Sequence, residues 1–237
     1  MLRTTRAIVL KTIRYGDRTV VLKAWTEQFG ARSYMVRTGA KRGVPAAALQ
    51  ALNRIELVVD EQPEREMHTV RELRVVRPYV RLPYEAVRGA LALFVQEVLY
   101  KVLREESPEI ALNEFIEDVL ENMDTAEDLR HFPLVFLTQL SGHLGFLPEL
   151  PLGAEEHFDL QEGQFVSAGH RHGHTMGPPL SHAFISLLEV DFTRMQDLHI
   201  PAPQRRDLLD YLLLYFRLHL EGMGELRSPA VLHEALN

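Results

Sequence analysis

The apolar residues of this chain change their spacing at one place, the segment Arg77–Pro83. Before this segment, short runs of β-branched and aromatic residues alternate with turns that contain glycine, a pattern typical of strands. After it, apolar residues recur every three or four positions, as they do on one face of a helix. Pro78 and Pro83 interrupt both kinds of element. We therefore expect an α+β fold with two domains, residues 1–80 and residues 81–237.

The first domain is expected to be a small β-barrel. Its five candidate strands are Ala7–Ile13, Thr19–Trp25, Arg32–Thr38, Arg54–Asp60 and Met67–Val76. A glycine-rich basic loop and a short alanine-rich helical turn separate the third strand from the fourth. Five short strands with one helical insert indicate the five-stranded OB-fold, a common nucleic-acid-binding barrel, with an SH3-like barrel as the alternative.

The second domain is expected to be all-α with an irregular insertion. Apolar stripes predict helices over residues 87–102, 112–123, 181–190 and 204–220. The run Asp124–Glu127 has the pattern of a capping box and predicts a further helix from Leu129 to about Phe146. Residues 148–179 contain glycine, proline and histidine with little periodicity. We expect irregular structure there, with one hairpin at His157–Val166.

Charge is segregated along the chain. The formal net charge is −7, but residues 1–82 contain 16 Lys and Arg against 8 Asp and Glu. Residues 83–237 contain 10 Lys and Arg against 25 Asp and Glu, so the two parts carry +8 and −15. Physiological salt screens charges beyond about 8 Å, so a polyanion responds to the local surface. The distribution therefore favours a nucleic-acid partner for the first domain.

The candidate nucleic-acid-binding residues are arginines and lysines of the first domain, because phosphates attract them without regard to base sequence. Arg37, Lys41 and Arg42 form the densest cluster, in a glycine-rich loop. No acidic residue lies between Glu27 and Glu56, so no local ion pair competes for this cluster. The remaining candidates are Arg3, Arg6, Arg14, Arg18, Lys23 and Arg32.

Aromatic side chains of the same region can stack on bases where they are exposed. The candidates are Tyr15, Trp25, Phe29 and Tyr34. For each of them the alternative is packing in the barrel core, where large apolar side chains are usually found.

Catalytic signatures are absent from the sequence. There is no cysteine, which excludes disulfides, thiolate zinc sites and cysteine nucleophiles. The Gly-Lys-Ser/Thr phosphate loop and the Gly-x-Ser-x-Gly elbow are also missing. We therefore expect a non-enzymatic protein without a cofactor. A non-enzymatic alternative to nucleic-acid binding is an adaptor protein. Its acidic second domain would bind basic proteins, and its arginines would only confer solubility.

A histidine-rich segment supports a competing hypothesis. His170, His172 and His174 alternate along it, with His157 and His182 nearby. Alternating histidines on an extended segment point to one side and could share a metal such as zinc. The alternative function is therefore a metal-dependent hydrolase that uses the His157–His182 region. Because no carboxylate is interleaved, we expect a solvated loop without bound metal.

The sequence predicts a cytoplasmic protein with no membrane association. The first 17 residues have a charge every few positions and no apolar core of signal-peptide length. No stretch approaches the roughly 18 apolar residues of a membrane span.

Two separated motifs resemble one known family. Residues 7–43, AIVLKTIRYGDRTVVLKAWTEQFGARSYMVRTGAKRG, are similar to the opening of RecO, a family of bacterial recombination mediators. The run Leu137–Leu150, LTQLSGHLGFLPEL, is similar to the family's leucine-rich helix that closes in Leu-Gly-Phe-x-Pro. The resemblance implies an OB-fold followed by a helical domain, binding of single-stranded DNA and annealing of complementary strands. It also implies loading of the RecA recombinase, together with RecR and the single-strand-binding protein.

The resemblance further implies a docking site for the acidic tail of the single-strand-binding protein. The candidates are Arg130, Arg205 and Arg206, scarce positive charges in an acidic domain. Many family members carry four cysteines that form a zinc site soon after the Leu-Gly-Phe helix. This chain has none, so no metal is carried over.

Overall fold

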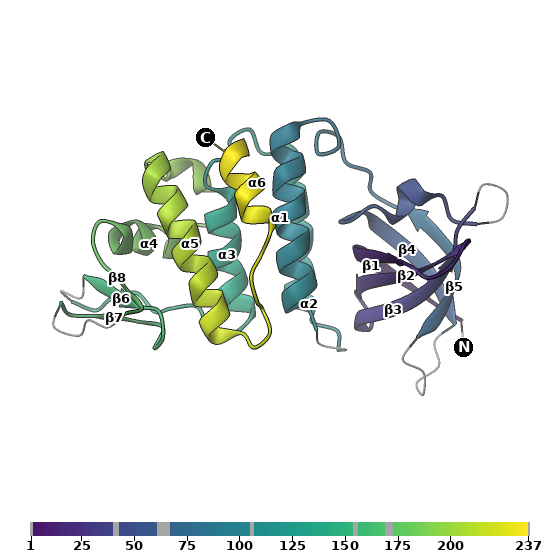
Figure 1. The fold of residues 1–237 in the computed structure, drawn as a ribbon, viewed down its shortest axis with the longest axis horizontal. Coiled ribbons are helices and arrows are strands. Elements are labelled where there is room, and N and C mark those ends of the chain that lie inside the picture. The colour runs from purple at the N-terminus through teal and green to yellow at the C-terminus, as the bar shows by residue number, and fades with distance from the viewer. Residues whose placement is uncertain are drawn as a thin grey trace. The chain divides into compact units, whose positions relative to one another are not determined.

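The computed structural model describes residues 2–39, 43–60, 67–104, 107–153, 156–168 and 173–236. The chain forms two compact units, Met1–Leu120 and Glu121–Asn237, called unit 1 and unit 2 below. Unit 1 contains a closed β-barrel followed by helices, and unit 2 contains helices and a small sheet (Figure 1). The α+β fold expected from the sequence is confirmed.

Five strands form the barrel of unit 1. They are β1 (Leu2–Arg14), β2 (Thr19–Thr26), β3 (Gly30–Arg37), β4 (Arg54–Asp60) and β5 (His68–Val75). Around the closed barrel they follow the order β1-β2-β3-β5-β4. The pair β3–β5 is parallel and the other neighbouring pairs are antiparallel. This confirms the predicted five-stranded, OB-type barrel.

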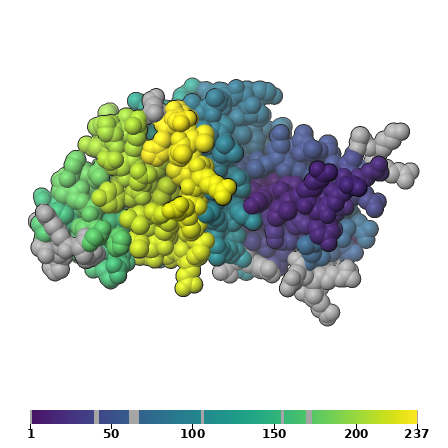
Figure 2. Space-filling view, in the orientation of Figure 1, coloured from purple at the N-terminus to yellow at the C-terminus, as the bar shows by residue number. Residues whose placement is uncertain are grey.

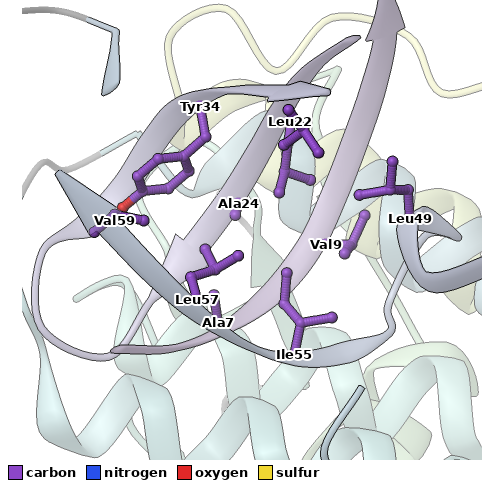
Figure 3. Packing of buried hydrophobic residues seen from close by; sticks show 10 residues of the cluster. Ala7, Val9, Leu22, Ala24, Tyr34, Leu49, Ile55, Leu57 and Val59 are labelled. Carbon is purple, nitrogen blue, oxygen red and sulfur yellow. The ribbon is translucent and has the colours of Figure 1, made fainter. Parts of the chain in front are cut away.

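The barrel core is formed by one face of each strand, because successive side chains of a strand point to opposite sides. Figure 3 shows Tyr34 of β3 pointing into the barrel toward Val59 of β4. Leu49, from the short 3₁₀ turn η1 (Ala46–Leu49), covers the core beside Val9. The buried cluster comprises Ala7, Val9, Leu22, Ala24, Tyr34, Val36, Leu49, Ile55, Leu57 and Val59.

Strand β1 is long enough to pair with two neighbouring strands of the barrel, β4 and β2. Its first half, Leu2–Ile8, pairs with β4, and residues from Ala7 onward pair with β2. The register shifts between Val9 and Lys11, which marks a β-bulge. A bulge bends its strand and changes which residues point outward. As a result, Ile8 lies opposite Trp25 before the bulge, and Lys11 lies opposite Lys23 after it.

Two helices follow the barrel, α1 (Ala86–Val102) and α2 (Ile110–Thr125), and unit 1 includes α2 as far as Leu120. Gln96 of α1 donates its side-chain N–H to the Leu10 carbonyl of β1 over 2.7 Å. The Nε atom of Arg54 lies 3.0 Å from a carboxylate oxygen of Glu117 on α2. The boundary between the compact units therefore falls later in the chain than residue 80. Independent folding of the first 80 residues stays a prediction.

Unit 2 is built on four helices. They are α3 (Phe132–His143), α4 (Leu180–Leu188), α5 (Ala202–His219) and α6 (Ser228–Ala235), with a 3₁₀ turn η2 at Met195–Asp197. Helix α3 packs against both α4 and α5. It is buried over nearly its whole length, so its sequence is apolar on all sides. Among the described residues, no helix combines the length and apolar character that a bilayer crossing requires.

The region expected to be irregular contains a small sheet of order β7-β6-β8. Strands β6 (His157–Asp159) and β7 (Gln164–Val166) form the predicted hairpin, and β8 (Thr175–Met176) adds a third strand that was not predicted. Phe158 of β6 anchors this sheet, since its ring makes an edge contact with Phe184 of α4 and another with Tyr215 of α5.

Two local predictions for the helices were wrong or incomplete. Asp124 is buried near the end of α2, and α3 begins at Phe132, so Asp124–Glu127 does not cap a new helix. The apolar face of α2 continues through the buried Met123, and this packing prevails over the local capping pattern. Helix α6 was not predicted, although its second residue, Pro229, is a helix-start signal.

Candidate functional site

The outer surface of β1, β2 and β3 forms one continuous face. Residues directly opposite one another in antiparallel strands point to the same side of the sheet. We define the outer strand face by three rows of such residues. They are the lysine row (Lys11, Lys23, Ser33), the apolar row (Ile13, Val21, Met35) and the end row (Tyr15, Thr19, Arg37). Tyr15 belongs to the end row because its backbone N–H donates to the Thr19 carbonyl over 3.1 Å.

Three of the predicted DNA-binding arginines come together at one end of the barrel. Arg14 is the last residue of β1 and Arg37 is the last residue of β3. Between them, the backbone N–H of Thr38 donates to the carbonyl of Arg18 over 2.9 Å, which joins the β1–β2 turn to the end of β3. All three arginine side chains are exposed. None of them forms an ion pair with a carboxylate in the described part of the chain.

Lys41 and Arg42, the other members of the predicted cluster, lie outside the described residues. The residues that flank them are described. The backbone N–H of Gly43 donates to the Gly39 carbonyl over 3.2 Å, and the N–H of Val44 donates to the Arg37 carbonyl over 2.9 Å. Both ends of the basic loop are therefore attached at the Arg37 end of the barrel.

Lys23 lies on the same outer face as Arg37. Its ammonium group donates to the Ser33 hydroxyl over 2.6 Å. Beside it, the Lys11 ammonium lies 4.6 Å from the centre of the Tyr100 ring on α1. Lys11 was missed as a site residue, because only the bulged register shows that it neighbours Lys23.

The remaining predicted cations are placed elsewhere. Arg6 lies opposite Glu56 of β4 and lines an open pocket of unit 1, together with Glu117 and Asp118. Arg32 lies opposite the buried Ala24 and is half-buried. The exposed Arg3 lies at the start of β1, a strand that Figure 2 shows in purple at the surface of unit 1. The structure does not place these three on the outer strand face.

The candidate stacking residues differ in how far their side chains are exposed to solvent. Trp25 and Tyr34 are 1% and 0% exposed, so the hypothesis that they stack on bases is wrong. Phe29 is half-buried against the barrel core. Tyr15 is 69% exposed and can meet a ligand.

The histidines do not form a site among the described residues. The register of β6 and β8 places Gly177 opposite His157, and the Leu160 N–H donates to the His174 carbonyl over 2.9 Å. His157 on β6 therefore lies opposite Gly177, whereas His174 precedes β8 and lies three residues away from Gly177 along the chain. His182 is exposed on α4, and His170 and His172 lie outside the described residues. No group of three or more potential metal ligands occurs in the described ranges.

The three candidate partner-binding arginines line one pocket of unit 2. We call it the arginine pocket; it is shallow and open to solvent. Arg130 precedes α3, while Arg205 and Arg206 are on the first turns of α5. Apolar side chains from α3, α5 and the end of α6 line the rest of the pocket: Pro133, Leu134, Ala202, Leu209, Leu232 and Leu236. The pocket therefore combines basic and apolar side chains in an otherwise acidic part of the chain.

Electrostatics make the arginine pocket a favourable place for an anion. Arg130 is bonded through two nitrogens to Asp128, and this hydrogen bonding lowers the pKa of the Asp128 carboxyl to about 2. Burial, followed by the positive charge of Arg130, lowers the pKa of Arg205. Burial, followed by the charge of Arg205, lowers the pKa of the nearby His131. Asp128 neutralises the charge of Arg130, but the charge of Arg205 remains. Arg206 adds a further, exposed guanidinium to the arginine pocket.

Comparison with known proteins covers nearly the whole chain. Residues 1–79 match the family model described as recombination protein O N terminal, and residues 84–229 match the one described as recombination protein O C terminal. The DNA repair protein RecO of Porphyromonas gingivalis is 30% identical over 243 residues, covering 98% of both chains. Those of Christiangramia forsetii and Bacteroides fragilis are each 29% identical and cover 99% of both chains.

Proposed function

Because the chain belongs to the RecO family of DNA repair and recombination proteins, we propose that it binds single-stranded DNA, anneals complementary strands and helps load RecA onto DNA coated by single-strand-binding protein. Membership of the family supports a role in DNA repair and recombination. Binding of single-stranded DNA, annealing and RecA loading are what we propose beyond that role. In this proposal the protein acts by binding rather than catalysis, in the cytoplasm, with RecR as a further partner.

The gathering of cations at one end of the barrel carries the DNA-binding part of the proposal. Strands β1, β2 and β3 together contain seven Lys and Arg and no Asp or Glu. Arg14, Arg18 and Arg37 are exposed where these strands end, at the base of the loop that contains Lys41 and Arg42. Exposed cations without carboxylate partners release the counterions of phosphates when they bind DNA, which favours association.

The arginine pocket supports the proposed contact with single-strand-binding protein. An acidic tail with a hydrophobic end needs positive charge beside an apolar surface. Arg205 and Arg206 supply the positive charge, and Leu209 and Leu232 are part of the apolar surface.

A salt series with labelled oligonucleotides tests the proposed function. We expect tighter binding to single-stranded than to double-stranded DNA of equal length. If about four phosphates are neutralised, the logarithm of affinity should fall with the logarithm of salt concentration with a slope near −3, at roughly 0.7 per phosphate. Binding that is absent at low salt, or that does not depend on salt, would contradict the proposal.

A further inference from the structure

One arginine of the arginine pocket already holds a carboxylate of this chain. Asp128 precedes Arg130 by two residues, in the loop between α2 and α3. The Nε–H of Arg130 lies 3.0 Å from each carboxylate oxygen of Asp128, and a terminal guanidinium N–H donates to one of these oxygens over 2.5 Å. Paired bonds of this kind are how an arginine usually binds a carboxylate ligand. Asp128 therefore has the position on Arg130 that a carboxylate of a ligand would take.

Arg205, in the same pocket, is held differently. One guanidinium nitrogen donates to the Ile200 carbonyl over 2.9 Å, and the other lies 3.5 Å from the Leu236 carbonyl. Both acceptors are uncharged, and no carboxylate among the described residues forms an ion pair with Arg205. The carbonyls orient the guanidinium without neutralising it. Arg205 can therefore attract an anion in the free protein, whereas Arg130 is already engaged.

The charge of Asp128 acts on the whole group of cations. Burial is the main cause of the lowered pKa of Arg205; the charge of Arg130 lowers it further, and the charge of Asp128 acts in the opposite sense. The same holds for His131, whose pKa is lowered by burial and then by Arg205, while Asp128 again acts to raise it. Asp128 thus offsets the repulsion between the cations. A bound anion would do the same, so Asp128 and a ligand compete for one positive charge cluster.

The pair of Asp128 and Arg130 is accessible and can open. The side chain of Arg130 is 64% exposed and that of Asp128 is 33% exposed. Exposed ion pairs are weak, because water and salt screen them. Only one residue separates the two partners, so rotation of their side chains is enough to part them. A ligand with several negative charges can therefore replace Asp128, at the cost of breaking its bonds to Arg130.

We propose that Asp128 is an internal competitor that limits the affinity of the arginine pocket for an acidic peptide. In the free protein it engages Arg130, while Arg205 and Arg206 make the first contacts with the ligand. Arg130 joins them only when Asp128 leaves. The proposal rests on the proposed function and adds the residue that sets the affinity of its pocket. It favours ligands with several carboxylates, because a single carboxylate gains little by exchanging with Asp128.

The test uses Asp128→Asn in the full chain. The amide oxygen can still accept the backbone N–H of Arg130, a bond of 3.0 Å in the wild type, so the loop keeps its turn while the charge is lost. Calorimetry with the acidic tail peptide of single-strand-binding protein at low salt should show binding roughly threefold to fivefold tighter than in the wild type. The gain should shrink at high salt. A misfolded variant cannot produce such a gain. Asp128→Ser, whose hydroxyl can also accept this N–H, should behave alike.

Asp197→Asn is the matched control. Asp197 forms an exposed ion pair with Arg194 over 3.5 Å, in the same unit, and neither residue lines the arginine pocket. The substitution changes the net charge by the same amount, yet it should leave the peptide affinity unchanged. Adding Arg130→Ala to Asp128→Asn should remove the gain, because the released guanidinium is its source.

The outcomes separate this proposal from the proposed function. If the wild type binds the peptide and Asp128→Asn binds it equally or more weakly, the competitor role is overturned and the pocket assignment stands. An equal gain in Asp197→Asn would show a general effect of net charge, and a gain that survives Arg130→Ala would show that Asp128 does not act through Arg130; both overturn the proposal. If neither the wild type nor Asp128→Asn binds the peptide, the contact assigned to the pocket under the proposed function fails as well.

Discussion

The indole N–H of Trp25 donates a hydrogen bond to the side-chain oxygen of Asn113 over 2.6 Å. Trp25 is on β2 and Asn113 is on α2, so the bond joins the barrel to a helix within unit 1. It also explains why the one tryptophan of the chain is buried although it points away from the barrel core.

Replacing Asn113 by leucine should destabilise unit 1. The buried indole N–H would lose its acceptor, which costs about 1–3 kcal/mol in the free energy of unfolding. Urea unfolding followed by the fluorescence of Trp25 measures this change. Glu114→Ala, at an exposed position on the same helix, is the control and should have little effect. An unchanged unfolding midpoint for Asn113→Leu would show that water takes the place of the missing acceptor.

The barrel should fold without its helices, but less stably. A fragment of residues 1–82 should give a circular dichroism spectrum dominated by strands, because the core cluster lies entirely within these residues. Compared with a fragment of residues 1–125, its tryptophan emission should shift to the red, since Trp25 loses the cover of α2. A helical or unfolded 1–82 fragment would count against a domain boundary near residue 80.

Replacing Arg37, Lys41 and Arg42 together by alanine should weaken binding to single-stranded DNA of every sequence. The salt dependence should become shallower by roughly 0.7 in slope for each phosphate that the variant no longer neutralises. Arg206→Ala, in the arginine pocket, is the control and should leave DNA affinity unchanged. If the triple variant keeps both the affinity and the slope of the wild type, the strand takes another path, past Arg3, Arg6, Arg14 and Arg18.

Arg206→Ala should in turn weaken binding of the acidic tail peptide of single-strand-binding protein. Arg206 is exposed at the edge of the arginine pocket, so we expect a loss of roughly fivefold that disappears at high salt. Calorimetry on the full chain measures it. The triple barrel variant is the control here and should bind the peptide normally. Equal affinities for Arg206→Ala and the wild type would remove the pocket from the proposal.

His131 should make unit 2 less stable in acid. Burial and then the charge of Arg205 lower its pKa in the folded chain, so the unfolded chain binds a proton at higher pH. Its contribution is present above the ordinary histidine pKa of about 6.5 and is lost as pH falls through the folded value. The unfolding temperature should therefore fall between pH 7.5 and pH 5.5, and fall less in His131→Gln. The exposed His199→Gln is the control and should behave like the wild type.

The architecture of the barrel could be predicted from the sequence because it depends on local spacing. Alternating apolar residues such as Leu22, Ala24, Tyr34 and Val36 identify both the strands and their buried face. The change of period at Arg77–Pro83 indicates where strands give way to helices. The basic character of β1, β2 and β3 is likewise a property of composition.

Only the tertiary structure decided which residues meet. The bulge near Val9 sets Lys11 beside Lys23, and the contact with Asn113 buries Trp25. The arginine pocket joins Arg130 to Arg205, which are far apart in the chain. Local spacing specifies the direction of a side chain within its own strand or helix. The register between strands and the packing of distant helices depend on long-range contacts, and no short segment of sequence contains these.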